Sequence, residues 1–265
     1  MNILKYRGFT RCAISEKINY RSRLLLNLAQ SGIEAAATFF LWRTLFNEQS
    51  VINGYTWNNM VFYIMIAFIM NATLGYGTES NISNKVLSGS IAMDLAKPLS
   101  FQHMCFAETI GSSLVEGILA IITGGGIALL LGDITQVFAL SYFGLFLISF
   151  VLAFTIKFLI SYFAGLCCFF TSNGYGVIYL RQVITDVFSG ALLPLSFYPL
   201  WFQKLSNALP FQSIVYLPTQ IFLGRIAVSA AWKLLGVQLL WVIFLWWFDR
   251  LFFHLAVRKI TIHGG

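Results

Sequence analysis

Three long stretches without a charged side chain constrain this sequence more than any other feature. They lie between Glu48 and Glu79, between Asp133 and Lys157, and between Lys157 and Arg181. Each can hold the roughly 20 apolar residues that cross the hydrocarbon core of a bilayer as an α-helix. The sequence therefore predicts an all-α integral membrane protein with several spanning helices.

The amino-acid composition indicates the same class. Charged residues make up 10% of the chain, against about 25% in soluble domains, and the mean hydropathy is +0.77. Such a chain cannot cover itself with a surface that faces water. Much of the net charge of +7 comes from residues 1–23, where six basic side chains accompany a single acid, Glu16. In a membrane protein this distribution predicts binding to anionic membrane lipids and not to nucleic acid.

Six membrane spans are predicted from the apolar runs, at about 24–46, 56–77, 104–131, 140–170, 177–198 and 232–255. The run from Ile134 to Leu180 also allows two spans that meet at Lys157, which would make seven. Cytoplasmic loops of membrane proteins carry an excess of basic residues. With six spans, eleven basic residues fall on the side of the two termini and the 78–103 loop, and four fall on the other side. Both termini and that loop are therefore predicted to be cytoplasmic.

The segment 198–231, between the fifth and sixth predicted spans, is apolar but interrupted by prolines. Pro199, Pro210 and Pro218 each tend to end a helix, and Pro194 precedes them. We predict one or two short helices that re-enter the outer leaflet and satisfy their broken backbone against protein. The alternative is a loop at the membrane interface, anchored by aromatic residues. Those residues are Tyr198, Trp201 and Tyr216.

A comparatively polar window, VLSGSIAMDLAKPLS at residues 86–100, stands between two apolar segments. It predicts an amphipathic helix from about Ser88 to Lys97, which Ser88 or Ser90 can cap and Pro98 ends. The apolar face would consist of Leu87, Ile91 and Leu95, whereas Asp94 lies off that face. Such a helix can lie on lipid headgroups without a partner, or insert its apolar face into a groove on a partner protein. The residues alone leave both possibilities open.

Motifs for catalysis and nucleotide binding are missing from the sequence. It contains no GxxxxGKS/T phosphate loop, no HExxH and no GxSxG. The histidines, His103, His254 and His263, are too scattered to predict a metal site. No catalytic residue, metal ligand or cofactor site is therefore assigned to this chain.

Several charged residues fall inside predicted spans, where each must face protein or water, because a charge at the bilayer centre costs at least about 2.5 kcal/mol. The candidates for lining a translocation path are Glu34, Glu108, Glu116 and Lys157. Glu108 and Glu116 are eight residues apart, so both can face the same side of a helix, and Lys157 is the expected partner of one of them. Arg181 is expected at the cytoplasmic boundary. These charges either tie helices together or line a path that attracts cationic cargo.

Two motifs, in this order, resemble those of permease subunits of type-2 ABC exporters. They are LSGSIAMDLAKPLS at 87–100 and FSGALLPLSFYPLWFQKLSNALPFQSIVYLPTQIFLG at 188–224. Within that family the chain is most similar to a branch that includes viologen-exporter-like permeases. The two motifs, the basic N-terminal arm and the order of spans extend the likeness over nearly the whole chain.

The resemblance implies one transmembrane permease domain over residues 1–265, with an interfacial elbow helix within 1–23 and a coupling helix in the 78–103 loop. The residues it assigns to contact with an ATPase are Leu87, Ser88, Gly89, Ile91, Asp94, Leu95, Lys97 and Pro98. A separate ATPase subunit would bind ATP and Mg, and this chain would hold no cofactor. A second permease subunit, identical or a sister chain, would complete the path in a bacterial inner membrane.

A different function is also open to such a chain. It could be a membrane scaffold or regulator whose cytoplasmic helix binds a partner that is not an ATPase. A secondary transporter is disfavoured, because that class often carries an internal repeat and none is found in this sequence.

Overall fold

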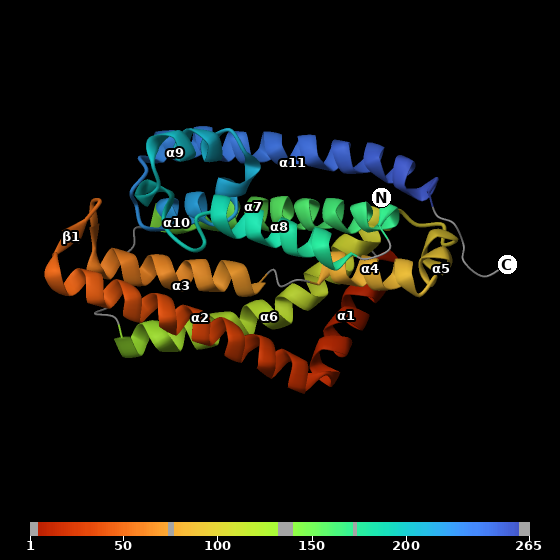
Figure 1. Ribbon diagram of the computed structural model, residues 1–265, viewed down its shortest axis with the longest axis horizontal. Helices are drawn as coiled ribbons and strands as arrows, with labels where there is room; N and C mark the ends of the chain where they lie inside the picture. The colour runs from red at the N-terminus through yellow and green to blue at the C-terminus, as the bar shows by residue number, and fades with distance from the viewer. Residues whose placement is uncertain (1–4, 74–76, 132–139, 172–173, 260–265) are drawn as a thin grey trace.

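The computed structural model describes residues 5–73, 77–131, 140–171 and 174–259, which form a bundle of long helices (Figure 1). The α-helices are α1 (Arg7–Asn19), α2 (Arg21–Glu48), α3 (Trp57–Thr73), α4 (Thr78–Leu87), α5 (Ile91–Leu95), α6 (Phe101–Leu131), α7 (Leu140–Cys167), α8 (Tyr175–Phe188), α9 (Leu200–Asn207), α10 (Tyr216–Phe222) and α11 (Val228–Val257). Short 3-10 helices are η2 (Cys168–Phe170), η3 (Leu195–Phe197) and η4 (Pro210–Ser213). Helix α7 packs against α11, α4, α10 and α8, and α6 packs against α1 and α3.

A small β-hairpin joins α2 to α3. Strands β1 (Val51–Ile52) and β2 (Tyr55–Thr56) are antiparallel, and the turn between them is Asn53–Gly54. Both turn residues have positive φ, 48° and 77°, which is the conformation that favours Asn-Gly in a two-residue hairpin. The hairpin, α9 and α10 lie at one end of the bundle, called the hairpin end (Figure 1). Helix α5 lies at the other, the α5 end.

Four stretches are long and apolar enough to cross a membrane. They are Trp57–Leu87, Phe101–Gly126, Ser141–Phe170 and Val228–Val257. These agree with the second, third, fourth and sixth predicted spans. Helix α7 continues without a break on both sides of Lys157, so the alternative of two spans meeting at that residue is wrong. The chain is a multi-pass membrane protein.

The first and fifth predicted spans differ from these four. Helix α2 is long, with 28 residues, but polar side chains such as Gln30, Glu34 and Arg43 interrupt its apolar character. Helix α8 has only 14 residues, about 21 Å at 1.5 Å per residue, against a hydrocarbon core of roughly 30 Å. The predicted fifth span, 177–198, was therefore too long.

The end of α8 has a clear physical cause. Directly after the helix, Gly190 has a φ of +80°, which lies outside the helical region and suits glycine. The carbonyl oxygen of Gly190 accepts a hydrogen bond of 2.5 Å from Tyr63 Oη, and the carbonyl oxygen of Ser189 accepts one of 2.9 Å from the Tyr216 amide. These contacts hold the turn against α3 and the start of α10.

The prolines of the 198–231 segment begin helices instead of ending them, contrary to the sequence-based expectation. Pro194 and Pro199 directly precede η3 and α9, Pro210 is the first residue of η4, and Pro218 lies in the first turn of α10. The N–H groups of a first helical turn have no partner within the helix, so proline is tolerated there. The segment forms short helices, as predicted.

The two largest clusters of buried apolar side chains lie along α7. The cluster toward the hairpin end includes Trp42, Tyr55, Met60, Tyr63, Ile156 and Ile214. The cluster toward the α5 end includes Ile82, Ile91, Phe101, Met104, Phe158 and Tyr162. Both clusters draw on helices from distant parts of the sequence, so they fix α3, α4 and α6 relative to α7.

Large apolar side chains also cover the outside of the bundle, most densely on α11. Those on α11 include Trp232, Leu240, Ile243, Phe244, Trp247 and Leu251, each more than two-fifths exposed. A water-soluble protein rarely exposes an apolar face of this kind. The outer face of α11 therefore fits contact with lipid tails.

Candidate functional site

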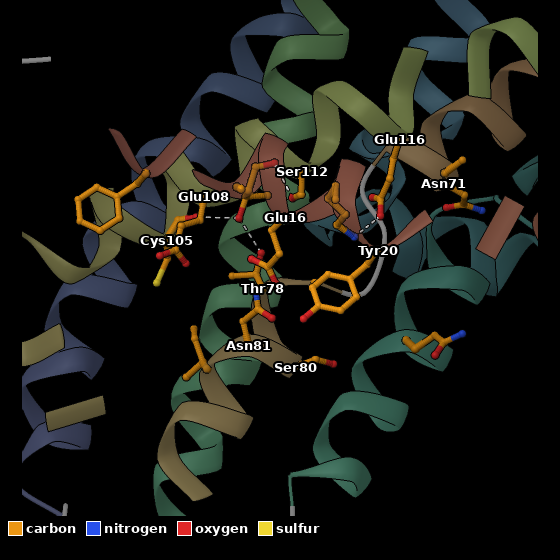
Figure 2. Close-up of a pocket in the computed structure, with 18 of the residues that line it drawn as sticks. Glu16, Tyr20, Asn71, Thr78, Ser80, Asn81, Cys105, Glu108, Ser112 and Glu116 are labelled. Carbon is orange, nitrogen blue, oxygen red and sulfur yellow. Dashed lines mark hydrogen bonds and ion pairs between the residues drawn. The ribbon is translucent and has the colours of Figure 1, made fainter. Parts of the chain in front are cut away.

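A cavity of about 800 Å³, partly open to the outside and lined by many polar side chains, lies among α1, α2, α3, α4, α6 and α8 (Figure 2). Five carboxylates and two lysines line it. They are Glu16, Glu34, Glu108, Glu116, Asp186, Lys17 and Lys85. The excess of acids gives the cavity a negative formal charge at neutral pH.

Helix α6 supplies one wall of the cavity through residues spaced three or four apart. Figure 2 shows Cys105, Glu108, Ser112 and Glu116 on this face of the helix. Side chains at such spacing lie one above another along a helix. The expectation that Glu108 and Glu116 share a face is confirmed.

Ion pairs cross the cavity from two directions. Lys17 of α1 pairs with Glu116, and Lys85 of α4 lies 3.4 Å from Glu108. The expectation that Lys157 pairs with one of these glutamates is wrong. Lys157 Nζ instead donates to the backbone carbonyl and to Oδ1 of Asn71, at 3.5 and 3.3 Å.

Three of the four predicted path residues therefore line one cavity. The fourth, Lys157, contacts a residue that lines it. Glu34 reaches the cavity from α2, where it accepts a 3.3 Å hydrogen bond from Gln30. Lys157 does not line the cavity itself but contacts Asn71, which does. The sequence identified three of the five acids of the site but not their partners.

Helix α1 forms a second wall and is docked on α6. Thr10 Oγ1 donates a 3.0 Å hydrogen bond to the carbonyl oxygen of Ala107, and Gly111 of α6 faces Thr10 and Ala13 of α1 closely. The cavity-lining residues of α1 are Phe9, Cys12, Ala13, Glu16 and Lys17, and Tyr20 follows directly after the helix. The face of α1 that carries Glu16 and Lys17 thus lines the cavity, which the sequence did not predict.

The 78–103 loop differs from the single helix predicted over Ser88–Lys97. Helix α4 ends at Leu87, the chain turns at Gly89 with a φ of +73°, and α5 then spans only Ile91–Leu95. Glycine suits this turn because a side chain at positive φ is strained. The predicted stop before Pro98 agrees with the end of α5.

The predicted apolar face of this segment is divided. Ile91 is buried against α6 and Leu95 packs on the same cluster, whereas Leu87 is 56% exposed. Met93, which was not among the predicted contact residues, is 70% exposed. The loop therefore anchors itself with one part of its apolar surface and leaves Leu87 and Met93 outside.

Charged side chains brace the loop. Asp94 is held by Lys97 at 2.6 Å and by Lys85 at 2.9 Å. Burial of Asp94 opposes ionisation, but hydrogen bonds from Lys97 and Lys85 outweigh it and hold the pKa of this carboxyl below its ordinary value. The predicted serine cap is absent: Ser90 stands at the start of α5 without a capping bond, and its hydroxyl lies 2.9 Å from that of Ser88.

Arg181 is buried inside the bundle, and its place at the cytoplasmic boundary stays a prediction. It forms an ion pair with Glu79 of α4, and the side chains of Arg181 and Glu79 are 7% and 0% exposed. This pair ties α8, one wall of the cavity, to α4. The sequence did not predict this role for Glu79. The residue lies at the end of an uncharged run, where a charged side chain is expected in a loop that faces water.

The structure thus defines a helical membrane protein that encloses a polar cavity next to a braced loop. Residues 33–264 match the family model described as ABC-2 family transporter protein. The match covers most of the sequence, so the chain belongs to this family of ABC transporter membrane proteins, and its resemblance to type-2 ABC permeases is confirmed. No curated protein matches the chain. The matched region begins within α2, so α1 precedes it.

Proposed function

We propose that this chain is the membrane-spanning permease subunit of an ABC exporter, in the viologen-exporter-like branch, and that a separate ATPase subunit drives it. The ATPase would bind ATP and Mg, while this chain would hold no cofactor and catalyse no reaction. The observation that carries the proposal is the exposed apolar surface of the loop between α4 and α6. Leu87 and Met93 stand out on a segment whose remaining apolar residues are anchored in the core. An exposed surface of this kind fits a groove on a partner protein.

The orientation proposed here has the α5 end in the cytoplasm of a bacterium, with the chain in the inner membrane. The basic residues support it, since eleven of them fall on the side of the termini and the 78–103 loop and four fall on the other side. The arrangement of elements is consistent with it. Tyr6, just before α1, and Phe253, near the end of α11, both pack on the same cluster as α5.

A second permease subunit, identical or a sister chain, is proposed to complete the path. Helices α2 and α8 line the cavity with polar side chains but expose apolar residues elsewhere. These include Leu25, Leu26 and Ile33 on α2, and Tyr179, Leu180 and Val183 on α8. Helix α8 is too short to cross the bilayer alone, so a partner on this side would help to shield its ends.

Co-purification tests the ATPase proposal against the scaffold alternative. From a mild detergent, the complete complex is expected to contain an ATP-hydrolysing subunit, and Met93→Ser is expected to reduce its recovery severalfold. Leu200→Ser is the matched control, because Leu200 is 74% exposed but lies at the hairpin end. Recovery of a different partner in place of an ATPase would favour the scaffold function, and equal recovery from both variants would remove Met93 from the interface.

The negative charge of the cavity leads to a prediction about cargo. Glu34→Gln removes a cavity carboxylate that has no basic partner among the described residues. A unit charge about 4 Å from a cation in a wet site contributes about 1 kcal/mol, so the half-saturating concentration of a cationic cargo should rise roughly fivefold.

The measurement for Glu34 is export of a lipophilic cation by reconstituted complex, with a lipophilic anion compared in parallel. Glu48→Gln, at the other end of α2 and outside the cavity lining, is the control. Unchanged export of the cation by Glu34→Gln would assign this carboxylate to structure and not to the path.

A further inference from the structure

Lys85 stands between two carboxylates that belong to different parts of the protein. Its Nζ lies 2.9 Å from Asp94 Oδ2 and 3.4 Å from both carboxylate oxygens of Glu108. Asp94 belongs to α5, in the loop proposed to meet the ATPase, whereas Glu108 lines the cavity. One ammonium group therefore connects the loop to the cavity wall.

These three side chains are partly shielded from water. Lys85, Asp94 and Glu108 have side-chain exposures of 27%, 12% and 24%. Ion pairs in such surroundings are screened less than exposed surface pairs, so their geometry affects the local field more strongly. Lys97 also binds Asp94, but it lies on the loop itself and does not line the cavity.

Movement of α5 would change how Lys85 is shared. Gly89, at a φ of +73°, turns the chain between α4 and α5, while Lys85 remains on α4. If Asp94 moves away with α5, Lys85 loses one of its two carboxylate partners. Lys85 then pairs with Glu108 alone and neutralises that carboxylate more fully. The cavity then loses negative charge and holds a cation less tightly.

We propose that Lys85 is a positioning residue through which the place of α5 sets the charge of the cavity. It rests on the proposed function, because the force that moves α5 is taken to come from the ATPase. In the resting arrangement Asp94 draws Lys85 away from Glu108, and the cavity favours a cation. When the ATPase displaces α5, Lys85 turns to Glu108 and the cation is released. The triad Asp94–Lys85–Glu108 thus converts a mechanical signal into a change of cargo affinity.

The test measures binding of tetraphenylphosphonium to the reconstituted permease–ATPase complex, without nucleotide and with ATP trapped. The wild-type complex is expected to bind this cation at least about fivefold more weakly in the trapped state, as the loss of one nearby charge would produce. Lys85→Met should abolish the difference between the two states, and Asp94→Asn should give the weaker affinity in both. Lys85→Arg, which keeps the cation, should preserve the difference.

Two controls separate this role from a general effect on folding. Lys204→Met removes an exposed lysine from α9 at the hairpin end and should leave the nucleotide-dependent change intact. ATP turnover of the Lys85 and Asp94 variants shows whether the complex is still assembled. If these variants turn over ATP and keep the full difference in affinity, the inference is overturned while the proposed function stands.

Other outcomes are equally decisive. A wild-type chain that assembles with no ATPase contradicts the proposed function itself. A wild-type complex that hydrolyses ATP but binds no tetraphenylphosphonium, or binds it equally in both states, overturns the role of Lys85 and leaves the permease function standing.

Discussion

Replacing Arg181 with alanine is expected to lower the free energy of unfolding by about 3–5 kcal/mol, the usual effect of removing one partner from a buried ion pair. Glu79 is fully buried, so the variant would leave its carboxylate without this guanidinium in a site that water does not reach. Because the pair joins α8 to α4, the loss should also loosen one wall of the cavity. Thermal unfolding of the purified protein in detergent would show a markedly lower midpoint.

The double variant Glu79→Gln, Arg181→Met separates two contributions to the free energy of unfolding. One is the cost of leaving a buried charge unpaired, and the other is the stabilisation that the ion pair itself provides. Because the double variant removes both charges of the pair together, it should recover much of the stability that Arg181→Ala loses. Arg43→Ala, at an exposed position on α2, should change the free energy of unfolding by no more than about 0.5 kcal/mol. An Arg181→Ala midpoint close to that of Arg43→Ala would mean that the pair does not hold α8 in place.

Four of the membrane spans could be predicted because they depend on local composition. The apolar runs predicted four helices that the structure has, including an α7 that carries Lys157 within a single span. Helical periodicity likewise put Glu108 and Glu116 on one face. The Asn53–Gly54 turn is a local feature of the same kind, since Asn-Gly is the strongest short-range hairpin signal.

The partners of the charged residues could not be predicted in the same way. Lys17 and Glu116 are 99 positions apart, and Arg181 and Glu79 are 102 apart. Such pairings depend on which helices pack together and in what rotation, and a single sequence does not encode that in any local pattern. Lys157 illustrates the limit: its depth in the membrane was predicted, but its contact with Asn71 in place of a glutamate follows only from the packing of α7 on α3.

Two local features differ from what their residue types commonly produce. Prolines that commonly end helices begin them in the 198–231 segment, because each falls at or just before a first turn. The α5 segment, predicted as one helix, is divided by the turn at Gly89. In both cases the residue type indicates a break in a helix, but it does not indicate whether a helix begins, ends or turns at that residue.

The second large effect is expected at Gly111, where α6 meets α1. A methyl group at this position would overlap the backbone carbonyl oxygen of Thr10 and come within 2.9 Å of Ala13 Cβ. A backbone atom cannot rotate aside as a side chain can, so Gly111→Ala must push α1 away from α6. Overpacking of this kind costs about 1–3 kcal/mol, and here the cost falls on the contact that closes the cavity.

Limited trypsin digestion measures the displacement directly, because α1 carries Arg11 and Lys17. Trypsin cleaves a docked helix only when the helix opens. If the contact is weakened by about 1–3 kcal/mol and opening is fast relative to cleavage, cleavage should become roughly 5- to 150-fold faster. Gly125→Ala is the matched control on the same helix, since a methyl group there meets nothing within 4 Å. It should leave the rate unchanged. If Gly111→Ala were cleaved no faster than Gly125→Ala, α1 would not be held on α6, and the cavity would lack the wall that brings Lys17 to Glu116.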